Sequence, residues 1–443
     1  MENNYNYFGI DKKKYIIDSY EYSNDELYIY ARKKKEKLYT CPSCGSTNIK
    51  LHSYKRKIIK HAHFTCTICY IHIKQRLMRC IDCYSFFLEQ FDFISNVKNI
   101  SKETLLYILN ELRKKQSFKE IALRANVSTQ SVINIFEKHV NCRPGRFPEI
   151  ICIDEFCYKH GKTINKYACI IIDFMTGEII DIIESRKHDF LIPYINEKIP
   201  QKEKNGVKYV ISDMYEGYEY LTKYQFPNAT FVIDSFHYIR YITNAFDSVR
   251  IRIQKNYTTK STEYYLLKKY SKLLLKFSFE IKEIDKSFYN KKLDRFISKN
   301  EIIDMCINLD EELKQAYFLK EIFFRSFNNT FSINAEKFVE KIIFEFSTSN
   351  IDEFISVSKT FNNWKEGIIN SFTRVNNRHL TNGPVEGVNN TIKTIIKISY
   401  WYSNFIHLRN RIMYIVNKKK NYISNQPNHN LNLYRKKRKW ILF

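Results

Sequence analysis

From residue 149 onwards the chain repeats one pattern, a short apolar run that ends in a carboxylate. Uninterrupted apolar runs of this length are typical of strands buried on both faces of a sheet. Three such runs follow one another closely, and two more alternate with stretches of helical pattern. The pattern therefore predicts an α/β sheet with strands over residues 149–156, 166–174, 178–185, 207–213 and 229–234.

Three antiparallel strands followed by helix–strand alternation is the order of an RNase H-like sheet, in which the first and fourth strands are neighbours. Asp154 and Asp213 end those two strands, so we expect them to meet at one edge. Two carboxylates at close range repel unless a cation lies between them, and Mg²⁺ (or Mn²⁺) suits oxygen ligands. Glu155 is expected on the opposite face. Asp234 ends a strand one step further from Asp154. Asp234 and His237 are therefore expected to contact the metal ligands rather than the metal itself.

The stretch TNGPVEGVNNTIKTI, residues 381–395, predicts a helix that starts at its proline. Its apolar residues fall on one face, whereas Glu386, Asn389, Asn390 and Lys393 fall on the other. Two interpretations of Glu386 follow. It can satisfy a free backbone N–H at the helix start and complement the helix dipole. Alternatively, it is the third carboxylate of a centre holding two Mg²⁺ ions, and its polar neighbours contact a DNA backbone.

Six of the eleven cysteines lie between residues 41 and 83. Two C-x-x-C turns flank segments that look like a pair of strands, and a hairpin would bring those turns together. We expect one structural Zn²⁺ ion, held by Cys41, Cys44, Cys80 and Cys83. Cys66 and Cys69 form a further C-x-x-C, but in a strand they face opposite ways. They are expected to be ordinary small apolar residues, with a second metal site as the alternative.

Residues 117–139, SFKEIALRANVSTQSVINIFEKH, match the pattern of a helix-turn-helix. Asn126 falls where the turn needs a left-handed residue, a conformation that Asn tolerates better than most. Ser128 can cap the second helix. The inward-facing apolar residues leave one face of that helix for a DNA groove, with Thr129, Gln130, Ser131 and Asn134 on it. A plain helical hairpin without a DNA role is the alternative.

The formal net charge of +25 over 443 residues indicates a polyanionic partner, with double-stranded DNA as the first candidate. A general compositional bias towards lysine is the competing explanation. The sequence shows neither a signal-peptide pattern nor an apolar run near the roughly 18 residues of a membrane span. We therefore expect a cytoplasmic, nucleoid-associated protein that contacts no membrane.

Taken in order, these motifs resemble the ISL-three group of bacterial insertion-sequence transposases. The resemblance spans nearly the whole chain and rests on CPSCG, RLMRCIDC, the helix-turn-helix, IDEF, ISDMYEGY, IDSFHYIRYITNAFDSVR and, most specifically, TNGPVEGVNNTIKTI. It implies an RNase H-like DDE catalytic domain whose three acids fall on Asp154, Asp213 and Glu386. The sequence departs from the family at Thr381, where serine is frequent, and in SYWYSNF, where tryptophan replaces the usual glycine.

The expected protein is therefore a multidomain α/β DNA transposase that binds the ends of its insertion sequence and catalyses metal-dependent strand cleavage and strand transfer. On DNA it is expected to act as a homodimer or a larger assembly. A non-enzymatic DNA-binding regulator and an RNase H-like structure-selective nuclease are the alternatives. The expected domains are a zinc ribbon (1–90), a helix-turn-helix (95–145), a catalytic domain (148–240 and 376–417) interrupted by a helical insertion (241–375), and a basic tail (418–443).

Overall fold

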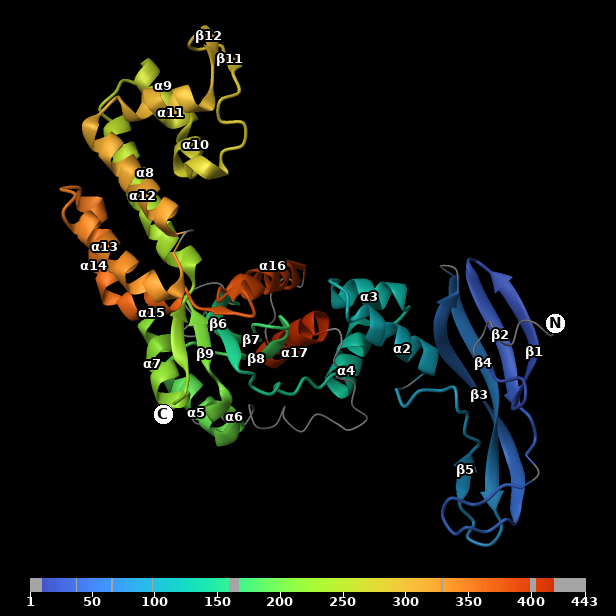
Figure 1. Cartoon of the computed structure of the whole chain (residues 1–443). Helices are drawn as coiled ribbons and strands as arrows, with labels where there is room; N and C mark the ends of the chain where they lie inside the picture. The colour runs from blue at the N-terminus through green and yellow to red at the C-terminus, as the bar shows by residue number, and fades with distance from the viewer. Residues whose placement is uncertain are drawn as a thin grey trace, which may run out of the picture. The chain divides into compact units, whose positions relative to one another are not determined.

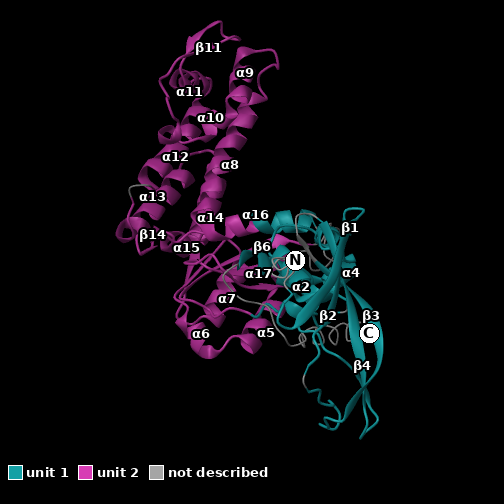
Figure 2. Cartoon of the chain, turned by 90° about the vertical axis from the view of Figure 1, so that its right-hand side faces the viewer, with its two compact units in different colours: residues 1–143, 390–443 teal, residues 144–389 magenta. Residues whose placement is uncertain are grey.

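The computed structural model describes residues 10–36, 38–64, 67–97, 99–158, 167–327, 330–398 and 404–417, with the backbone alone at 62–64. Cys66 and the basic tail therefore lie outside the described residues. The chain divides into two compact units, residues 1–143 with 390–443, and residues 144–389 (Figure 2). The boundary between the units falls inside helix α16 (Gly383–Ile398).

A five-stranded sheet forms the first part of the first unit (Figure 1). Its strand order is β1-β2-β4-β3, and β5 pairs with β4. One face is apolar and packs around buried Tyr15, Ile29, Ile71 and Phe93, while the other carries polar side chains. The strands are β1 (Tyr15–Ser23), β2 (Glu26–Lys33), β3 (Ile49–Phe64), β4 (Thr67–Cys80) and β5 (Phe86–Leu88).

Helices complete the first unit: α2 (Lys102–Glu111), α3 (Phe118–Arg124), α4 (Thr129–His139) and α17 (Phe405–Val416). Between α3 and α4 the chain turns at Asn126, whose φ is 50°, as its position in the sequence predicts. The Ser128 side chain accepts a hydrogen bond from the Ser131 N–H and caps α4, also as predicted. Asn126 contacts the sheet as well: its amide donates to the Tyr70 hydroxyl (2.8 Å), and its carbonyl accepts from Lys60 Nζ (2.6 Å).

The second unit is built on a sheet of order β10-β9-β6-β7-β8. Strands β6, β7 and β8 are antiparallel, whereas β9 runs parallel to β6 and β10 runs parallel to β9. All five strands fall close to their expected bounds, and the expected pairing of the first strand with the fourth is present. The strands are β6 (Ile150–Cys157), β7 (Tyr167–Asp173), β8 (Ile179–Ile183), β9 (Tyr209–Ser212) and β10 (Thr230–Ile233).

Alternate residues of these strands face a large apolar core. Ile151, Val210 and Ile233 belong to it, together with Leu191 of α5 and Leu221 of α7. The other face meets the segment that leads into α16, where the Cys152 thiol lies 4.0 Å from the Thr381 carbonyl oxygen. The helices around the core side are α5 (His188–Lys198), α6 (Gln201–Gly206), α7 (Glu216–Gln225) and α8 (Ser235–Gln254).

The expected insertion is mainly helical in its described residues, although it also contains a short hairpin that the sequence did not predict. A tight hairpin then leads back to α16, and its two central residues, Asn376 and Asn377, both have positive φ. The elements in order are α9 (Thr262–Lys269), α10 (Ser271–Leu275), η1 (Ser278–Glu280), β11 (Phe288–Asn290), β12 (Arg295–Ile297), α11 (Lys299–Ile307), α12 (Glu311–Phe327), η2 (Ser332–Asn334), α13 (Ala335–Ser347), α14 (Asp352–Asn363), α15 (Lys365–Asn370), β13 (Arg374–Val375) and β14 (Arg378–His379).

Gly367 allows α15 to pack closely on β10. A Cβ at this position would lie 2.6 Å from Ile233 Cδ1 and 2.8 Å from Ile233 Cγ1, whereas a Cβ at Gly206 would meet nothing within 4 Å. Gly367→Ala should therefore lower the free energy of unfolding by about 1–3 kcal/mol. Gly206→Ala should leave it unchanged or raise it by up to about 1 kcal/mol. Urea unfolding followed by circular dichroism measures both, and equal midpoints would contradict this packing.

Candidate active site and cysteine cluster

Strand register places three aspartates at one edge of the second unit's sheet. The last paired residues of β6 and β9 are Cys152 and Ile211, and each lies two positions before an aspartate, Asp154 or Asp213. Asp234 directly follows β10, level with Asp213. Because side chains alternate along a strand, this register puts the three carboxylates on one face of the sheet.

The pKa values of the three aspartates are shifted by burial and by the charges of their neighbours. Burial raises the pKa of Asp154 to about 6, and the charge of Asp213 contributes to this rise. Burial also raises the pKa of Asp213 and that of Asp234, and the charge of Glu386 adds to the rise at Asp234. His237 has the opposite effect on all three pKa values and lies 3.9 Å from Asp234, between its Nε2 and Oδ2. The four carboxylates and the imidazole thus form one charged cluster.

The start of α16 is bound to this cluster by two hydrogen bonds. The Asn382 backbone N–H donates to Asp234 Oδ1 (3.1 Å), and the Asn389 side-chain amide donates to Asp154 Oδ2 (2.9 Å). Glu386 lies between these contacts in the sequence, and its side chain is exposed. Within the described residues its carboxylate accepts no hydrogen bond from the helix N-terminus, so the structure does not show the capping interaction of the alternative interpretation.

The oxygen atoms of the cluster are the ligand types that a hard divalent cation takes, but among the described residues no three of its carboxylate and imidazole ligand atoms lie within 4.8 Å of one another. Among the described residues, Asp154, Asp213 and Glu386 form no ion pair with lysine or arginine. The buried side-chain oxygens of Asn382 and Asn389 also have no hydrogen-bond partner there. Several oxygen acceptors without a matching donor are the ligands that Mg²⁺ takes in proteins. A bound cation would offset the charges of the carboxylates.

Glu155 shows how the opposite face of β6 differs. Its carboxylate forms an ion pair with Arg186 and lies 3.4 Å from the Tyr218 hydroxyl, on the side of the apolar core. The expected alternation of Asp154 and Glu155 is therefore confirmed. Glu155 is paired with the Arg186 guanidinium, whereas Asp154 has no lysine or arginine partner among the described residues.

The other residues expected to contact DNA lie on α4 and α16. Thr129, Gln130 and Asn134 are exposed, and Ser131 is half-buried against the Ser128 cap. The Gln130 amide donates to the Asn134 side-chain oxygen (2.7 Å), so the two side chains lie together on the outer face of α4. Asn390 and Lys393 are exposed on α16. Asn389 was expected on a DNA backbone, whereas the structure places its amide on Asp154.

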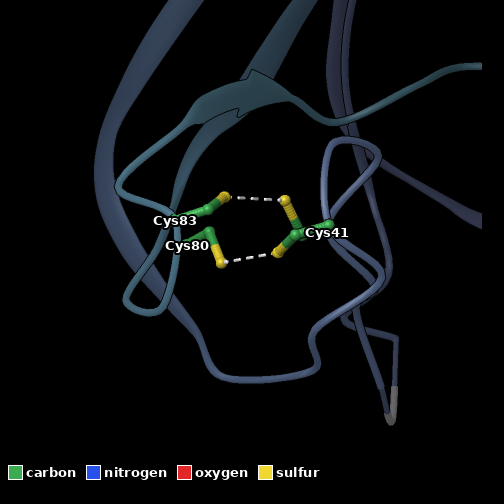
Figure 3. A group of neighbouring side chains, drawn as sticks. Cys41, Cys80 and Cys83 are labelled. Atoms are coloured by element: carbon green, nitrogen blue, oxygen red, sulfur yellow. Dashed lines mark hydrogen bonds between the residues drawn. The ribbon is translucent and has the colours of Figure 1, made fainter.

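Four cysteines form a compact cluster at one end of the first unit's sheet (Figure 3). Their sulfur atoms all lie within 4.8 Å of one another, and the Cys41–Cys83 and Cys44–Cys80 pairs are each 3.6 Å apart. The β3–β4 hairpin brings them together, because Ile49 pairs with Cys80, as the sequence predicts. A hydrogen bond with the Ser85 hydroxyl lowers the pKa of Cys41 to about 6, whereas hydrogen bonds with the neighbouring sulfur atoms raise the pKa of Cys44 to about 12. The cluster is compatible with one zinc ion.

Cys69 belongs to a different environment. It lies in the buried apolar face of the sheet, where burial raises the pKa of its thiol to about 12. Its burial in the apolar face, apart from the four clustered cysteines, favours the interpretation of Cys69 as a small apolar residue. The described residues contain no other group of cysteines, histidines or carboxylates with metal-ligand spacing.

The roles of Asn382 and Asn389 are what sequence reasoning missed. A helical repeat does place Asn389 three residues after Glu386, on the same face, which is a signal for a shared site. Asn382 acts through its backbone N–H, which carries no sequence signal at all.

Comparison with known proteins identifies the class of this chain as transposase. A family model for transposases of the DDE type, the ISL3 group, matches residues 151–412. The match covers more than half of the sequence, and the chain belongs to the ISL3 DDE transposase family, as the motifs predict. The transposase for insertion sequence element IS1001 of Bordetella parapertussis is 22% identical over 398 residues, which cover 88% of this chain and 92% of that relative. In the ranges that the structure describes, no helix has the length and apolar character needed to cross a bilayer.

Asp154 makes a testable contribution to stability. Its pKa of about 6 lies above its ordinary value of 3.8, so ionising it costs stability above pH 6, and this cost disappears as the pH falls through the interval between the two values. Without added divalent ions, Asp154→Asn should therefore stabilise the protein by about 1–3 kcal/mol at pH 7.5 and by much less at pH 4.

Thermal unfolding at both pH values measures this difference, with Asp285→Asn, at an exposed turn of the same unit, as the control. Adding Mg²⁺ should stabilise the wild type more than Asp154→Asn, because an ion that binds only the folded state raises its stability. An unchanged midpoint for Asp154→Asn at pH 7.5 would contradict the electrostatic cost.

Proposed function

We propose that this transposase cuts DNA strands at the ends of its insertion sequence and joins them to a target, with Asp154, Asp213 and Glu386 as the three acids of an RNase H-like DDE site. The observation that carries the proposal is the cluster of carboxylates without lysine or arginine partners among the described residues, formed by two neighbouring parallel strands and the start of α16. Membership of the ISL3 DDE transposase family and the strand order of the second unit support it.

Asp154, Asp213 and Glu386 would hold the Mg²⁺ or Mn²⁺ ions that a DDE site requires. When bound, such ions activate the attacking oxygen and stabilise the leaving oxygen at phosphorus. The remaining groups act on the ligands. The Asn389 amide and the Glu155 backbone N–H each donate to one carboxylate oxygen of Asp154 and so orient it, and Asp234 fixes the start of α16 through Asn382.

Charge-removing variants test this assignment. Asp154→Asn, Asp213→Asn and Glu386→Gln should each lower the rate of strand cleavage by on the order of 100-fold or more, because a metal site loses affinity and geometry when one ligand loses its charge. Double variants should lose little more than single ones, since the three groups act as a unit. The assay is cleavage of end-labelled duplex DNA from the ends of the insertion sequence, with and without Mg²⁺.

Affinity for the same DNA should stay within about threefold of the wild type in all three variants, since a carboxylate contributes nothing favourable to phosphate binding. Asp285→Asn is the control and should cleave normally. Asp234→Asn should be milder, because an amide oxygen can still accept from the Asn382 N–H. Normal cleavage by Glu386→Gln would favour the alternative interpretation, in which Glu386 only stabilises the start of its helix. A wild type that binds the ends without cleaving them would favour a regulator, and one that cleaves unrelated branched DNA equally well would favour a nuclease.

For DNA recognition we propose α3 and α4 as a helix-turn-helix whose second helix enters the major groove. The left-handed turn at Asn126 and the capped, exposed start of α4 support this. Gln130 and Asn134 carry amides of the kind that pair with adenine edges. Their mutual hydrogen bond would be exchanged for base contacts in the complex.

We also propose that the cysteine cluster holds one structural Zn²⁺ ion. Purified protein should then contain one zinc per chain by elemental analysis, and Cys44→Ser or Cys83→Ser should lose it, because removing one of four thiolates opens the tetrahedral site. Cys157→Ser, in the second unit, should keep the metal and serves as the control. Zinc-free wild-type protein, or two zinc ions per chain, would contradict this assignment.

A further inference from the structure

Two runs of three lysines meet at the open end of the β1–β2 hairpin. The runs are 12–14 and 33–35, and they are separated by two strands and a turn in the sequence. The antiparallel register pairs Tyr15 with Lys33, and the Lys34 N–H donates to the Lys14 carbonyl oxygen (2.8 Å). The fold therefore places the two runs side by side.

The lysines line a hollow rather than a flat surface. A cavity of about 440 Å³ opens between the two runs and the loop that follows β5, and five of the six lysines line it. The acidic groups nearby are Asp11, Glu36 and Asp92, half as many as the lysines. The hollow thus has an excess of positive charge.

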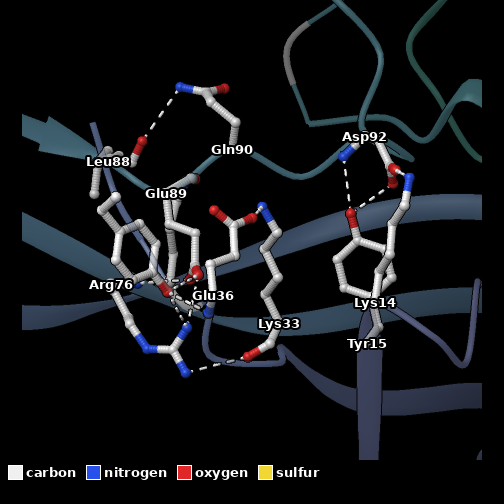
Figure 4. Close-up of polar contacts among 11 residues, drawn as sticks. Lys14, Tyr15, Lys33, Glu36, Arg76, Leu88, Glu89, Gln90 and Asp92 are labelled. Atoms are coloured by element: carbon white, nitrogen blue, oxygen red, sulfur yellow. Dashed lines mark hydrogen bonds and ion pairs between the residues drawn. The ribbon is translucent and has the colours of Figure 1, made fainter. Parts of the chain in front are cut away.

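The frame of the hollow is held by specific contacts (Figure 4). Asp92 accepts from both Lys14 Nζ (2.6 Å) and the Tyr15 hydroxyl (2.5 Å). Arg76 of β4 donates to the Lys33 carbonyl oxygen (3.2 Å) and pairs with buried Glu89 (2.6 Å). These contacts bind β1, β2 and the loop after β5 to one another, so the backbone that carries the lysines is fixed.

The remaining lysines are available for a ligand. Lys14 is paired with Asp92, and Lys33 is paired with Glu36. The other four lysines are exposed and form no ion pair within the described residues: Lys12, Lys13, Lys34 and Lys35. Ammonium groups on these two neighbouring runs repel one another, and a polyanion relieves that repulsion.

Protection of a sheet edge is the simpler explanation, since β1 is an edge strand and edge lysines prevent strand pairing between molecules. That role calls for lysines along the strand. Here Lys12, Lys13 and Lys14 precede β1, and Lys34 and Lys35 follow β2, so none of the five lies within either strand. Their position around a concave surface favours binding.

Strand β4 relates the hollow to the helix pair. Tyr70 of β4 contacts Asn126 in the turn before α4, and Arg76, which holds the hollow, lies six residues further along the same strand. Six strand residues span about 20 Å, and phosphates on one strand of B-DNA are about 3.4 Å apart along the axis. The length of β4 between these two contacts therefore corresponds to about six base pairs of duplex.

We propose that this lysine hollow binds the sugar–phosphate backbone of duplex DNA without reading its sequence, beside the proposed base-reading helix α4. The inference rests on the proposed function for its partner. It adds a second, sequence-independent contact to the first unit. Phosphate contacts of this kind position a protein on DNA and strengthen binding to any sequence.

The test compares two sets of four lysine substitutions in the full-length protein. The first is Lys12→Gln, Lys13→Gln, Lys34→Gln and Lys35→Gln combined. The control combines Lys291→Gln, Lys292→Gln, Lys337→Gln and Lys341→Gln, which removes the same charge from exposed positions of the second unit. Affinity is measured by fluorescence anisotropy at several salt concentrations, for element-end DNA and for unrelated duplex of the same length, after equal thermal midpoints confirm folding.

The hollow variant should bind both DNAs at least about tenfold more weakly at low salt, and the slope of log affinity against log salt should become shallower by about 2 to 4, at roughly 0.9 per lost phosphate contact. Its preference for element ends should be unchanged. Gln130→Ala with Asn134→Ala should do the reverse, losing preference while keeping the slope.

An unchanged salt slope, or an equal change in the control, would overturn the proposal. The proposal would also be overturned if the hollow variant lost binding to vesicles of anionic lipid but kept the wild-type salt slope on DNA. Failure of the proposed function is a separate outcome. In that case the wild-type protein would show no preference for element ends and would not cleave them. The slope measured on unrelated duplex still tests the hollow in that case.

Discussion

The hydrogen bond from the Asn382 N–H to the Asp234 carboxylate joins segments 148 residues apart, and the geometry of the candidate active site depends on it. Asp234 directly precedes α8, where the N-terminal end of the helix dipole favours a negative charge. The contact is charge-assisted and buried, which makes it stronger than a neutral hydrogen bond. It sets where α16 begins, and therefore where Glu386 and Asn389 lie relative to the sheet edge. Asp234 is thus a positioning residue in the proposed site.

The contrast between Asp154 and Glu155 shows that this edge is held at an electrostatic cost. The two residues are adjacent, yet Glu155 is paired with Arg186, while Asp154 is half-buried and accepts hydrogen bonds only from neutral donors, the Asn389 amide and the Glu155 N–H. An arginine could satisfy either carboxylate, and the described residues pair one with Glu155 and none with Asp154. Departures from local electrostatic consistency are expected at functional sites. Burial without a basic partner raises the pKa of Asp154, as this departure requires.

Sequence reasoning succeeded where a feature depends on local chemistry. Asn126 takes its left-handed turn and Ser128 caps α4 because both properties belong to a few neighbouring residues. The strands that carry Asp154 and lead to Asp213 were found because a buried strand is a continuous apolar run, although β6 does not end at Asp154 as expected and continues to Cys157. The contacts of Asn382 and the pairing of the two lysine runs depend on register between distant segments. The hairpin of β11 and β12 has strands of three residues, too short for a period of two to stand out.

Strand β4 links the cysteine cluster to both of the proposed DNA contacts. Along one strand lie Tyr70 at the helix pair, Arg76 at the lysine hollow and Cys80 in the cluster. A slip of one residue between β3 and β4 would turn every side chain to the other face, removing Tyr70 from Asn126 and Ile71 from the core. The irregularities within the β3–β4 pairing leave room for such a slip. Cross-linking the start of β3 to the end of β4 through one metal ion excludes it, so the proposed zinc ion would hold both proposed DNA contacts in a single register.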